Sequence, residues 1–236
     1  MIFYLGSSLT NKERFNWVKK HFRYSFQDLS LLDQAFTHRS FSKKNNERLE
    51  FLGDSLLSFS ISRRLYASRL ETSEGDLSRY RSELVKGITL SKIAKEIDIS
   101  KCLILGSGAA SSGGGNSDSV LACTMEAILG AIYIDGGYED ADRSVGFIFN
   151  DRLMYLPDSS SLKDSKTKLQ EALQREDRDV PVYKIKNISG AEHKKKFIIT
   201  CEIERPYKIT EGIGHSKKVA EQKAAESMIL KINNEE

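Results

Sequence analysis

Three carboxylates lie close together in NNERLEFLGDSLL, residues 45–57. Glu47, Glu50 and Asp54 are spaced i, i+3 and i+7, so a helix would hold them within about 80° of one another. Like charges at helical neighbour spacing repel, and the repulsion grows when the side chains are partly buried. A divalent cation would remove it, and hard oxygen ligands suit Mg²⁺ or Mn²⁺, which also bind substrate phosphate. The spacing is therefore compatible with a cation site, although it is also typical of a solvated helix face.

The residues around these acids help to decide between a cation site and a solvated helix face. Phe51 and Leu52 place the acids beside packed surface, which argues against an open, solvated face. Glu126 lies in the strongly apolar VLACTMEAILGAIYIDGG, where an isolated glutamate is costly without a partner, and it could complete an acidic site. Glu74 opens EGDLSRYR, where it could join the same site or simply favour a helix N-terminus.

The elements that must position these acids are mostly helical. Before residue 155, apolar residues recur every three or four positions, which is the helical period. Residues 106–117, GSGAASSGGGNS, are typical of a loop and fit neither the GxxxxGK[ST] nor the GxGxxG phosphate-binding pattern. With 39% hydrophobic and 29% charged residues, the chain has the composition of a soluble globular protein. No stretch approaches the roughly 18 apolar residues of a membrane span, so we expect no membrane association.

The three cysteines, Cys102, Cys123 and Cys201, are odd in number and widely spaced, with no CxxC pair. This pattern argues against a disulfide framework and against a structural zinc site, and it favours a reducing compartment. We therefore expect a cytoplasmic protein.

A second region of different character follows a linker. The proline and serines of YLPDSSSLKDSKTK indicate a linker at 156–162, which divides the chain into 1–155 and 163–236. The last part predicts the order α-β-β-β-α, because helical periods flank three runs of alternating apolar and polar residues. From residue 162 onward there are 16 lysines and arginines against 13 acids, whereas the first 161 residues hold 20 of each. This basic excess hints at a polyanion partner for the last third.

Together these segments resemble a known family. NERLEFLGDSLL closely resembles the signature of bacterial ribonuclease III, and EGDLSRYRSELVKGITLSKIA and LACTMEAILGAIYIDGG are similar to its next two segments, in the same order. The stretch from SKTKLQEALQ to GIGHSKKVAEQKAAESMI resembles a double-stranded-RNA-binding domain. The resemblance covers about residues 11–232. It implies an all-helical ribonuclease III endonuclease domain followed by an α-β-β-β-α double-stranded-RNA-binding domain.

The resemblance also implies a reaction, the Mg²⁺-dependent hydrolysis of phosphodiesters in double-stranded RNA. The products would carry 5′-phosphate and 3′-hydroxyl ends, and the substrates would include ribosomal RNA precursors and other structured transcripts. By motif, Glu50, Asp54 and Glu126 would be metal ligands, with Asp54 and Glu126 as the catalytic residues. Glu47 and Glu74 would be further members of the acidic cluster. Such metal-assisted hydrolysis requires no nucleophilic serine or cysteine.

One position departs from the family pattern. The family has an aspartate ligand where this chain has Cys123, three residues before Glu126. A thiol is soft, mostly protonated at neutral pH and ill suited to Mg²⁺. Three interpretations stay open: water takes the vacant coordination position, the enzyme prefers a softer ion such as Mn²⁺, or the protein is a weakened nuclease that mainly binds RNA duplexes.

The resemblance further assigns RNA contacts in the C-terminal domain. Duplex RNA is recognised by shape, through phosphates and 2′-hydroxyls. One minor groove is assigned to the first helix of this domain and the next to the loop GAEHKK. The phosphates between them are assigned to the start of the last helix, where a helix N-terminus favours anions. The assigned residues are Thr167, Gln170, Glu171, His193, Ser216, Lys217 and Lys218.

A duplex has two strands, so two acidic clusters related by a two-fold axis could cut both. The resemblance implies such a homodimer and puts Phe51 and Leu52 at its interface, although these side chains would also suit an ordinary core. A more distant alternative is a helical interaction protein without a metal site, whose activity would not depend on Mg²⁺.

Overall fold

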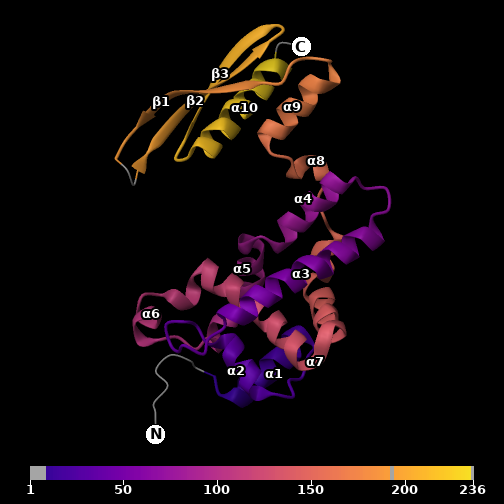
Figure 1. Cartoon of the computed structure of the whole chain (residues 1–236), viewed down its shortest axis with the longest axis vertical. Helices are drawn as coiled ribbons and strands as arrows, with labels where there is room; N and C mark the ends of the chain where they lie inside the picture. Colours follow the sequence, from indigo (N-terminus) through magenta and orange to yellow (C-terminus); the bar gives the residue numbers. More distant parts are fainter. Residues whose placement is uncertain (1–8, 192–193, 235–236) are drawn as a thin grey trace. The chain divides into compact units, whose positions relative to one another are not determined.

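A computed structural model describes residues 9–191 and 194–234 of the chain (Figure 1). It divides into two units, of which the first ends at Pro157 and the second begins at Asp158. This boundary falls in the segment 156–162 that the sequence indicates as a linker. Within that segment, Ser159–Leu162 form the short helix α8.

Helices make up most of the first unit, which confirms the helical fold implied by the sequence. The loop prediction for residues 106–117 is wrong in part, because the short helix α6 and the 3₁₀ turn η2 lie there. Turns this short present no periodic apolar face, so a pattern search does not detect them. The elements are α1 (Asn11–Phe22), α2 (Leu29–Phe36), α3 (Glu47–Ser68), α4 (Glu74–Val85), α5 (Gly87–Glu96), η1 (Ile99–Cys102), α6 (Ser107–Ser111), η2 (Gly114–Asn116) and α7 (Asp118–Met154).

Helices α3 and α7 pack against each other through two glycines. A Cβ atom on Gly53 of α3 would lie 1.8 Å from the backbone oxygen of Glu126, and one on Gly130 of α7 would lie 2.2 Å from a backbone oxygen of α3. Any larger residue at either position would push the two backbones apart, so the close approach requires glycine. This contact holds the part of α3 that carries Glu50 and Asp54 against Glu126.

Helix α7 is the core helix of the first unit. Nearly every residue from Thr124 to Ile132 is buried, and the helical geometry is interrupted at Gly137, with φ 80° and ψ −176°. By length and composition, α7 is apolar enough to cross a membrane, contrary to the expectation from the sequence. However, 56% of its apolar window is buried inside the structure, as is usual for the core helix of a globular unit.

The second unit has the predicted order of elements. Its strands form one antiparallel sheet in the order β1-β2-β3, and Cys201 of the central strand lies opposite Tyr183 on one side and Thr210 on the other. The elements are α9 (Ser165–Arg175), β1 (Val182–Ser189), β2 (Lys196–Glu204), β3 (Tyr207–Gly214) and α10 (Lys217–Asn233).

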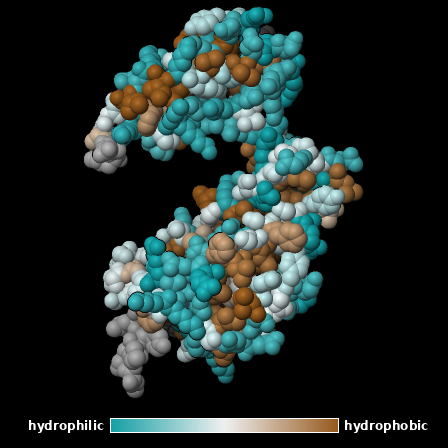
Figure 2. Space-filling view, viewed as in Figure 1, coloured by the Kyte–Doolittle hydropathy of each residue, from teal (hydrophilic) through white to brown (hydrophobic). Residues whose placement is uncertain are grey.

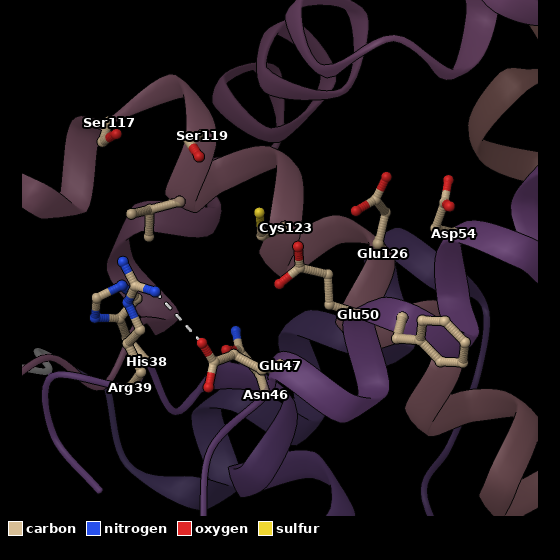
Figure 3. Close-up of a pocket in the computed structure, with 12 residues that line it drawn as sticks. His38, Arg39, Asn46, Glu47, Glu50, Asp54, Ser117, Ser119, Cys123 and Glu126 are labelled. Atoms are coloured by element: carbon tan, nitrogen blue, oxygen red, sulfur yellow. Dashed lines mark hydrogen bonds and ion pairs between the residues drawn. The ribbon is translucent and has the colours of Figure 1, made fainter. Parts of the chain in front are cut away.

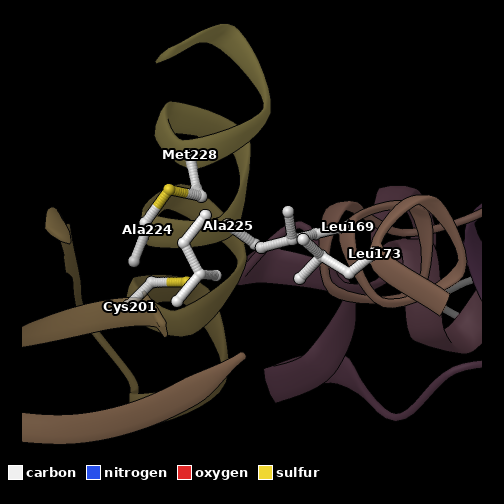
Figure 4. Packing of buried hydrophobic residues seen from close by; sticks show 7 residues of the cluster. Leu169, Leu173, Cys201, Ala224, Ala225 and Met228 are labelled. Atoms are coloured by element: carbon white, nitrogen blue, oxygen red, sulfur yellow. The ribbon is translucent and has the colours of Figure 1, made fainter. Parts of the chain in front are cut away.

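Both long helices of this unit contribute to one small core against the sheet (Figure 4). Small residues let α10 lie close to β3, because a Cβ atom on Gly212 would be 2.1 Å from the backbone oxygen of Ala220. Ala220, Ala224 and Met228, which recur at helical spacing along α10, are buried, and Ile232, the next position of this stripe, is partly buried. The core residues are Leu169, Leu173, Cys201, Ile203, Ala224, Ala225 and Met228.

Candidate active site and nucleic-acid interface

A pocket of about 800 Å³ opens in the first unit between the start of α3, the start of α7 and the segment before α3 (Figure 3). Glu50, Asp54 and Glu126 lie at one end of it, and its basic lining residues, His38 and Arg39, lie at the other beside Glu47. The lining residues are His38, Arg39, Asn46, Glu47, Glu50, Phe51, Asp54, Ser117, Ser119, Val120, Cys123 and Glu126.

Three potential metal ligands converge in this pocket. One atom each from Glu50, Cys123 and Glu126 lies within 4.8 Å of the other two. Glu50 comes from α3, whereas Cys123 and Glu126 are one turn apart on the same face of α7. Asp54 lines the same pocket but lies outside this close group, on the far side of Glu126 from Cys123 (Figure 3).

The acids are poorly compensated by cations. Burial, followed by the charges of Asp54 and Glu50, raises the pKa of Glu126 to about 7. Within residues 9–191 and 194–234, no lysine, arginine or histidine forms an ion pair with Glu50, Asp54 or Glu126. Such a site is short of positive charge, and its oxygen donors suit a hard divalent cation. The carboxylates of the site therefore suit the hard divalent cation that the sequence implies.

Cys123 is the exception in this donor set. Burial, then hydrogen bonding to Glu50 and the charges of Glu50 and Glu126, raise the pKa of its thiol to about 12. The side chain is partly exposed in the pocket, whereas Cys102 and Cys201 are fully buried core residues. At neutral pH, Cys123 is thus a neutral thiol among carboxylates, at the position where the resemblance implies an aspartate ligand.

The remaining members of the expected acidic cluster lie apart from the ligand group. Glu47 is exposed at the rim of the pocket, 3.5 Å from the guanidinium of Arg39, and accepts a hydrogen bond from the Asn45 amide. Glu74 is in the first turn of α4, where its carboxylate accepts a hydrogen bond from Ser78. Glu74 is not among the residues that line the pocket described above. The structure thus brings Glu47 to the rim of the site and leaves Glu74 out of it.

The basic end of the pocket was not anticipated from the sequence. His38 and Arg39 belong to the segment between α2 and α3, whose backbone is held by a hydrogen bond from the His38 amide to Ile104. The His38 ring is oriented by a 2.8 Å hydrogen bond between Nδ1 and Ser40 Oγ. The adjacent His-Arg pair just ahead of the acidic helix is the signal that could have drawn attention to this segment.

Phe51, expected at a dimer interface, is 78% exposed, which excludes an ordinary core role in the isolated chain. Leu52 is partly buried beside it. Apolar side chains gather over α3 and α7 on the face shown in Figure 2. Exposed apolar residues on these two helices include Phe51, Phe59 and Ile134.

The second unit brings four of the expected RNA contacts together. Thr167 and Gln170 of α9 and Lys217 and Lys218 of α10 line one surface hollow. Ser216 caps the N-terminus of α10 by accepting a hydrogen bond from the Val219 amide, which leaves the two lysines on its first turn.

Two assigned RNA contacts remain, Glu171 and His193. Glu171 lies outside the hollow and forms a 2.5 Å ion pair with Lys163. His193 lies outside the residues that the structure describes.

The chain matches two family models. Residues 28–155 match "Ribonuclease-III-like" and residues 165–232 match "Double-stranded RNA binding motif". Among curated relatives, the chain is 47% identical to the Ribonuclease 3 of Hahella chejuensis, over 89% of this chain and 92% of that one. It is 44% identical to the Ribonuclease 3 of Wigglesworthia glossinidia brevipalpis, over 93% and 97% of the two chains.

A solved structure agrees with these matches. The nuclease domain of ribonuclease III from Campylobacter jejuni covers 58% of this chain and 96% of its own, with a TM-score of 0.55 and 35% identity. Fold, domain order and close relatives over nearly the full length lead to one conclusion: the chain belongs to the ribonuclease III family.

Proposed function

We propose that the protein is an endoribonuclease that hydrolyses phosphodiester bonds of double-stranded RNA with a divalent cation. One observation carries the proposal: Glu50 and Glu126 converge with Cys123 in a pocket that Asp54 also lines, and none of these carboxylates forms an ion pair with a cation among the described residues. The same chain carries a double-stranded RNA binding motif, which would deliver the polyanion. We expect 5′-phosphate and 3′-hydroxyl products, and structured transcripts such as ribosomal RNA precursors as substrates in the cytoplasm.

In this proposal, Glu50 and Glu126 hold the cation, which we expect to be Mg²⁺, while Asp54 supports it from the far side of Glu126. When bound, the cation supplies a hydroxide nucleophile and stabilises the charge that develops on the phosphate. Arg39 and His38 lie at the other end of the pocket, where Arg39 would offer a phosphate backbone a positive charge and His38, whose pKa is lowered by burial and by the charge of Arg39, would offer a hydrogen bond. The acids thereby fix the reacting phosphate, and the basic end holds the strand that leads into it.

The second unit would hold the duplex by its shape. Lys217 and Lys218 on the first turn of α10 would contact phosphates, assisted by the helix N-terminus. Thr167 and Gln170 in the same hollow would reach the minor groove, where 2′-hydroxyls are displayed. No base-specific contact is needed for this mode of recognition.

Cleavage of both strands suggests that the working form is a homodimer. Phe51 is exposed next to the acids, and an exposed phenylalanine is well suited to an interface between two copies. The matched Campylobacter jejuni nuclease domain is described as having a region involved in dimer formation.

The test is cleavage of a duplex RNA by the full chain with and without Mg²⁺, beside a Glu126→Gln variant. We expect Mg²⁺-dependent cutting by the wild type and a loss of at least about a hundredfold in Glu126→Gln, because an essential charged ligand is removed. Equal cutting by this variant would refute the site. The binding-only alternative is not favoured, since the relatives at 42–47% identity carry the name Ribonuclease 3. It would regain support if only Cys123→Asp cuts.

A further inference from the structure

The donor set in the pocket is mixed rather than purely oxygen. Sγ of Cys123 and one carboxylate oxygen each of Glu50 and Glu126 lie within 4.8 Å of one another. Asp54, the remaining carboxylate of the pocket that we assign to the site, lies outside this group. The closest donors are therefore two oxygens and one sulfur.

We propose that Cys123 turns this position into a site that prefers thiophilic divalent cations, of the Zn²⁺ and Cd²⁺ class, over Mg²⁺. Glu50, Cys123 and Glu126 are its three protein ligands. The inference rests on the proposed function, because it concerns the same cation pocket, but it makes a separate claim about which ion that pocket holds most tightly.

Three protein ligands would leave one open position on a tetrahedral cation. Zn²⁺ binds sulfur at about 2.3 Å and carboxylate oxygen at about 2.0–2.2 Å, which puts two ligands of one ion roughly 3.5 Å apart. Donors already within 4.8 Å of one another need only small side-chain adjustments to reach that separation. On binding, the thiol proton is released to solvent as the sulfur–metal bond forms.

Mg²⁺ fits the same donors less well. It demands near-octahedral oxygen ligands at about 2.0–2.1 Å, and sulfur is a poor ligand for it. With Cys123 in place of a carboxylate, Mg²⁺ loses a charged ligand, whereas a thiophilic ion gains its preferred one. A thiol in place of one carboxylate thus weakens the binding of Mg²⁺ and strengthens the binding of a thiophilic cation.

The other cysteines provide an internal contrast. Cys102 and Cys201 are both 0% exposed, and neither lines the pocket. Among the described residues, Cys123 is the cysteine that combines partial exposure with two neighbouring carboxylates. A thiolate–metal signal from the folded protein would therefore report on Cys123.

The experiment is a titration of the full chain with Cd²⁺, followed by the ultraviolet thiolate-to-metal charge-transfer absorption. Cys123→Ser keeps the side-chain size but removes the soft donor, and Cys123→Asp restores a carboxylate. We expect a saturable band in the wild type that is absent in both variants. We also expect at least about tenfold weaker Cd²⁺ binding in Cys123→Ser, since even the loss of an outer-shell partner costs 10–100-fold in metal affinity.

Competition with Mg²⁺ gives the selectivity directly. The ratio of Cd²⁺ to Mg²⁺ affinity should be at least about tenfold larger in the wild type than in Cys123→Asp, as ligand softness dictates. Modification of Cys123 by a thiol reagent should be slowed by Cd²⁺ at concentrations where Mg²⁺ has no effect. No charge-transfer band, the same band in Cys123→Ser, or equal affinity ratios would each overturn the inference.

Cleavage assays on the same preparations separate the two claims. Mg²⁺-dependent cutting without the Cd²⁺ band would leave the proposed function standing and reject the thiophilic site. The Cd²⁺ band without any Mg²⁺-dependent cutting would support the thiophilic site and reject the proposed function.

Discussion

Asp142 illustrates how one buried charge connects two helices. Its carboxylate on α7 accepts hydrogen bonds from Ser60 Oγ at 2.6 Å and from Arg63 and Arg64 at 2.5 Å each, all three on α3. Burial alone would raise its pKa, but the hydrogen bonds from Arg64 and Ser60 and the arginine charges outweigh burial and lower the pKa to about 2. The folded state therefore favours the ionised form of Asp142.

This lowered pKa predicts a loss of stability in acid. Because the folded pKa lies below the ordinary value of 3.8, the contribution is fully present above about pH 4 and disappears as the pH falls towards 2. The contribution is roughly 2 kcal/mol of unfolding free energy. Urea unfolding between pH 7 and pH 2.5 would measure it. Asp142→Asn should be less stable at pH 7 and should lose less stability over that acid range, and an unchanged pH profile in this variant would contradict the assignment.

At the scale of helices, the contact of α3 with α7 at Gly53 governs the acid site. Gly53→Ala would place a methyl group into the backbone oxygen of Glu126 and force the helices apart. We expect a loss of about 1–3 kcal/mol in unfolding free energy from overpacking. We also expect a drop in cleavage larger than unfolding explains, because Glu50 and Asp54 move away from Glu126.

Gly75→Ala is the matched control for this change. Gly75 is also helical, and the nearest atom to its added Cβ is in the Arg79 side chain at 3.8 Å, an ordinary contact. Alanine there should be neutral or stabilise by up to about 1 kcal/mol. Thermal melts and single-turnover cleavage of both variants make the comparison, and similar behaviour of the two would remove the special role of Gly53.

The first turn of α10 makes a second prediction at this scale. Replacing both Lys217 and Lys218 with alanine should weaken duplex RNA binding uniformly across sequences. It should also reduce the slope of log affinity against log salt by up to about 0.9 for each phosphate that is no longer neutralised. Filter binding or anisotropy at several salt concentrations measures this slope. Lys231→Ala, at the other end of α10, should leave the slope unchanged.

The sequence anticipates these elements well where local patterns decide them. The alternation in KKFIITCEIE predicts β2, and the stripe containing Ala220, Ala224 and Met228 predicts the buried face of α10. It does not anticipate the basic end of the pocket, because Arg39 meets the acids only through packing of the segment before α3. For the same reason, it could not show that Glu74 lies outside the pocket, since that depends on where α4 runs.

At the scale of the whole molecule, the prediction concerns assembly. Phe51→Ala should shift the equilibrium towards monomer, because an exposed aromatic anchor next to the active site is removed. Sedimentation velocity across a concentration series would detect the shift. Leu230→Ala, in the second unit and also exposed, is the control and should leave the sedimentation profile unchanged. Identical profiles for wild type and Phe51→Ala would place the interface elsewhere.

The glycine contact between α3 and α7 also bears on how the protein can vary. The distance between the two helices is set by direct contact of main-chain atoms, because no side chain lies between them at these glycines. Repacking elsewhere in the interior, for example at Ile61 or Leu65, would alter stability while the separation of the carboxylates stayed nearly constant. The distance between the catalytic carboxylates is therefore insensitive to substitutions in the surrounding hydrophobic core. An engineer could redesign that core first and test RNA cleavage afterwards.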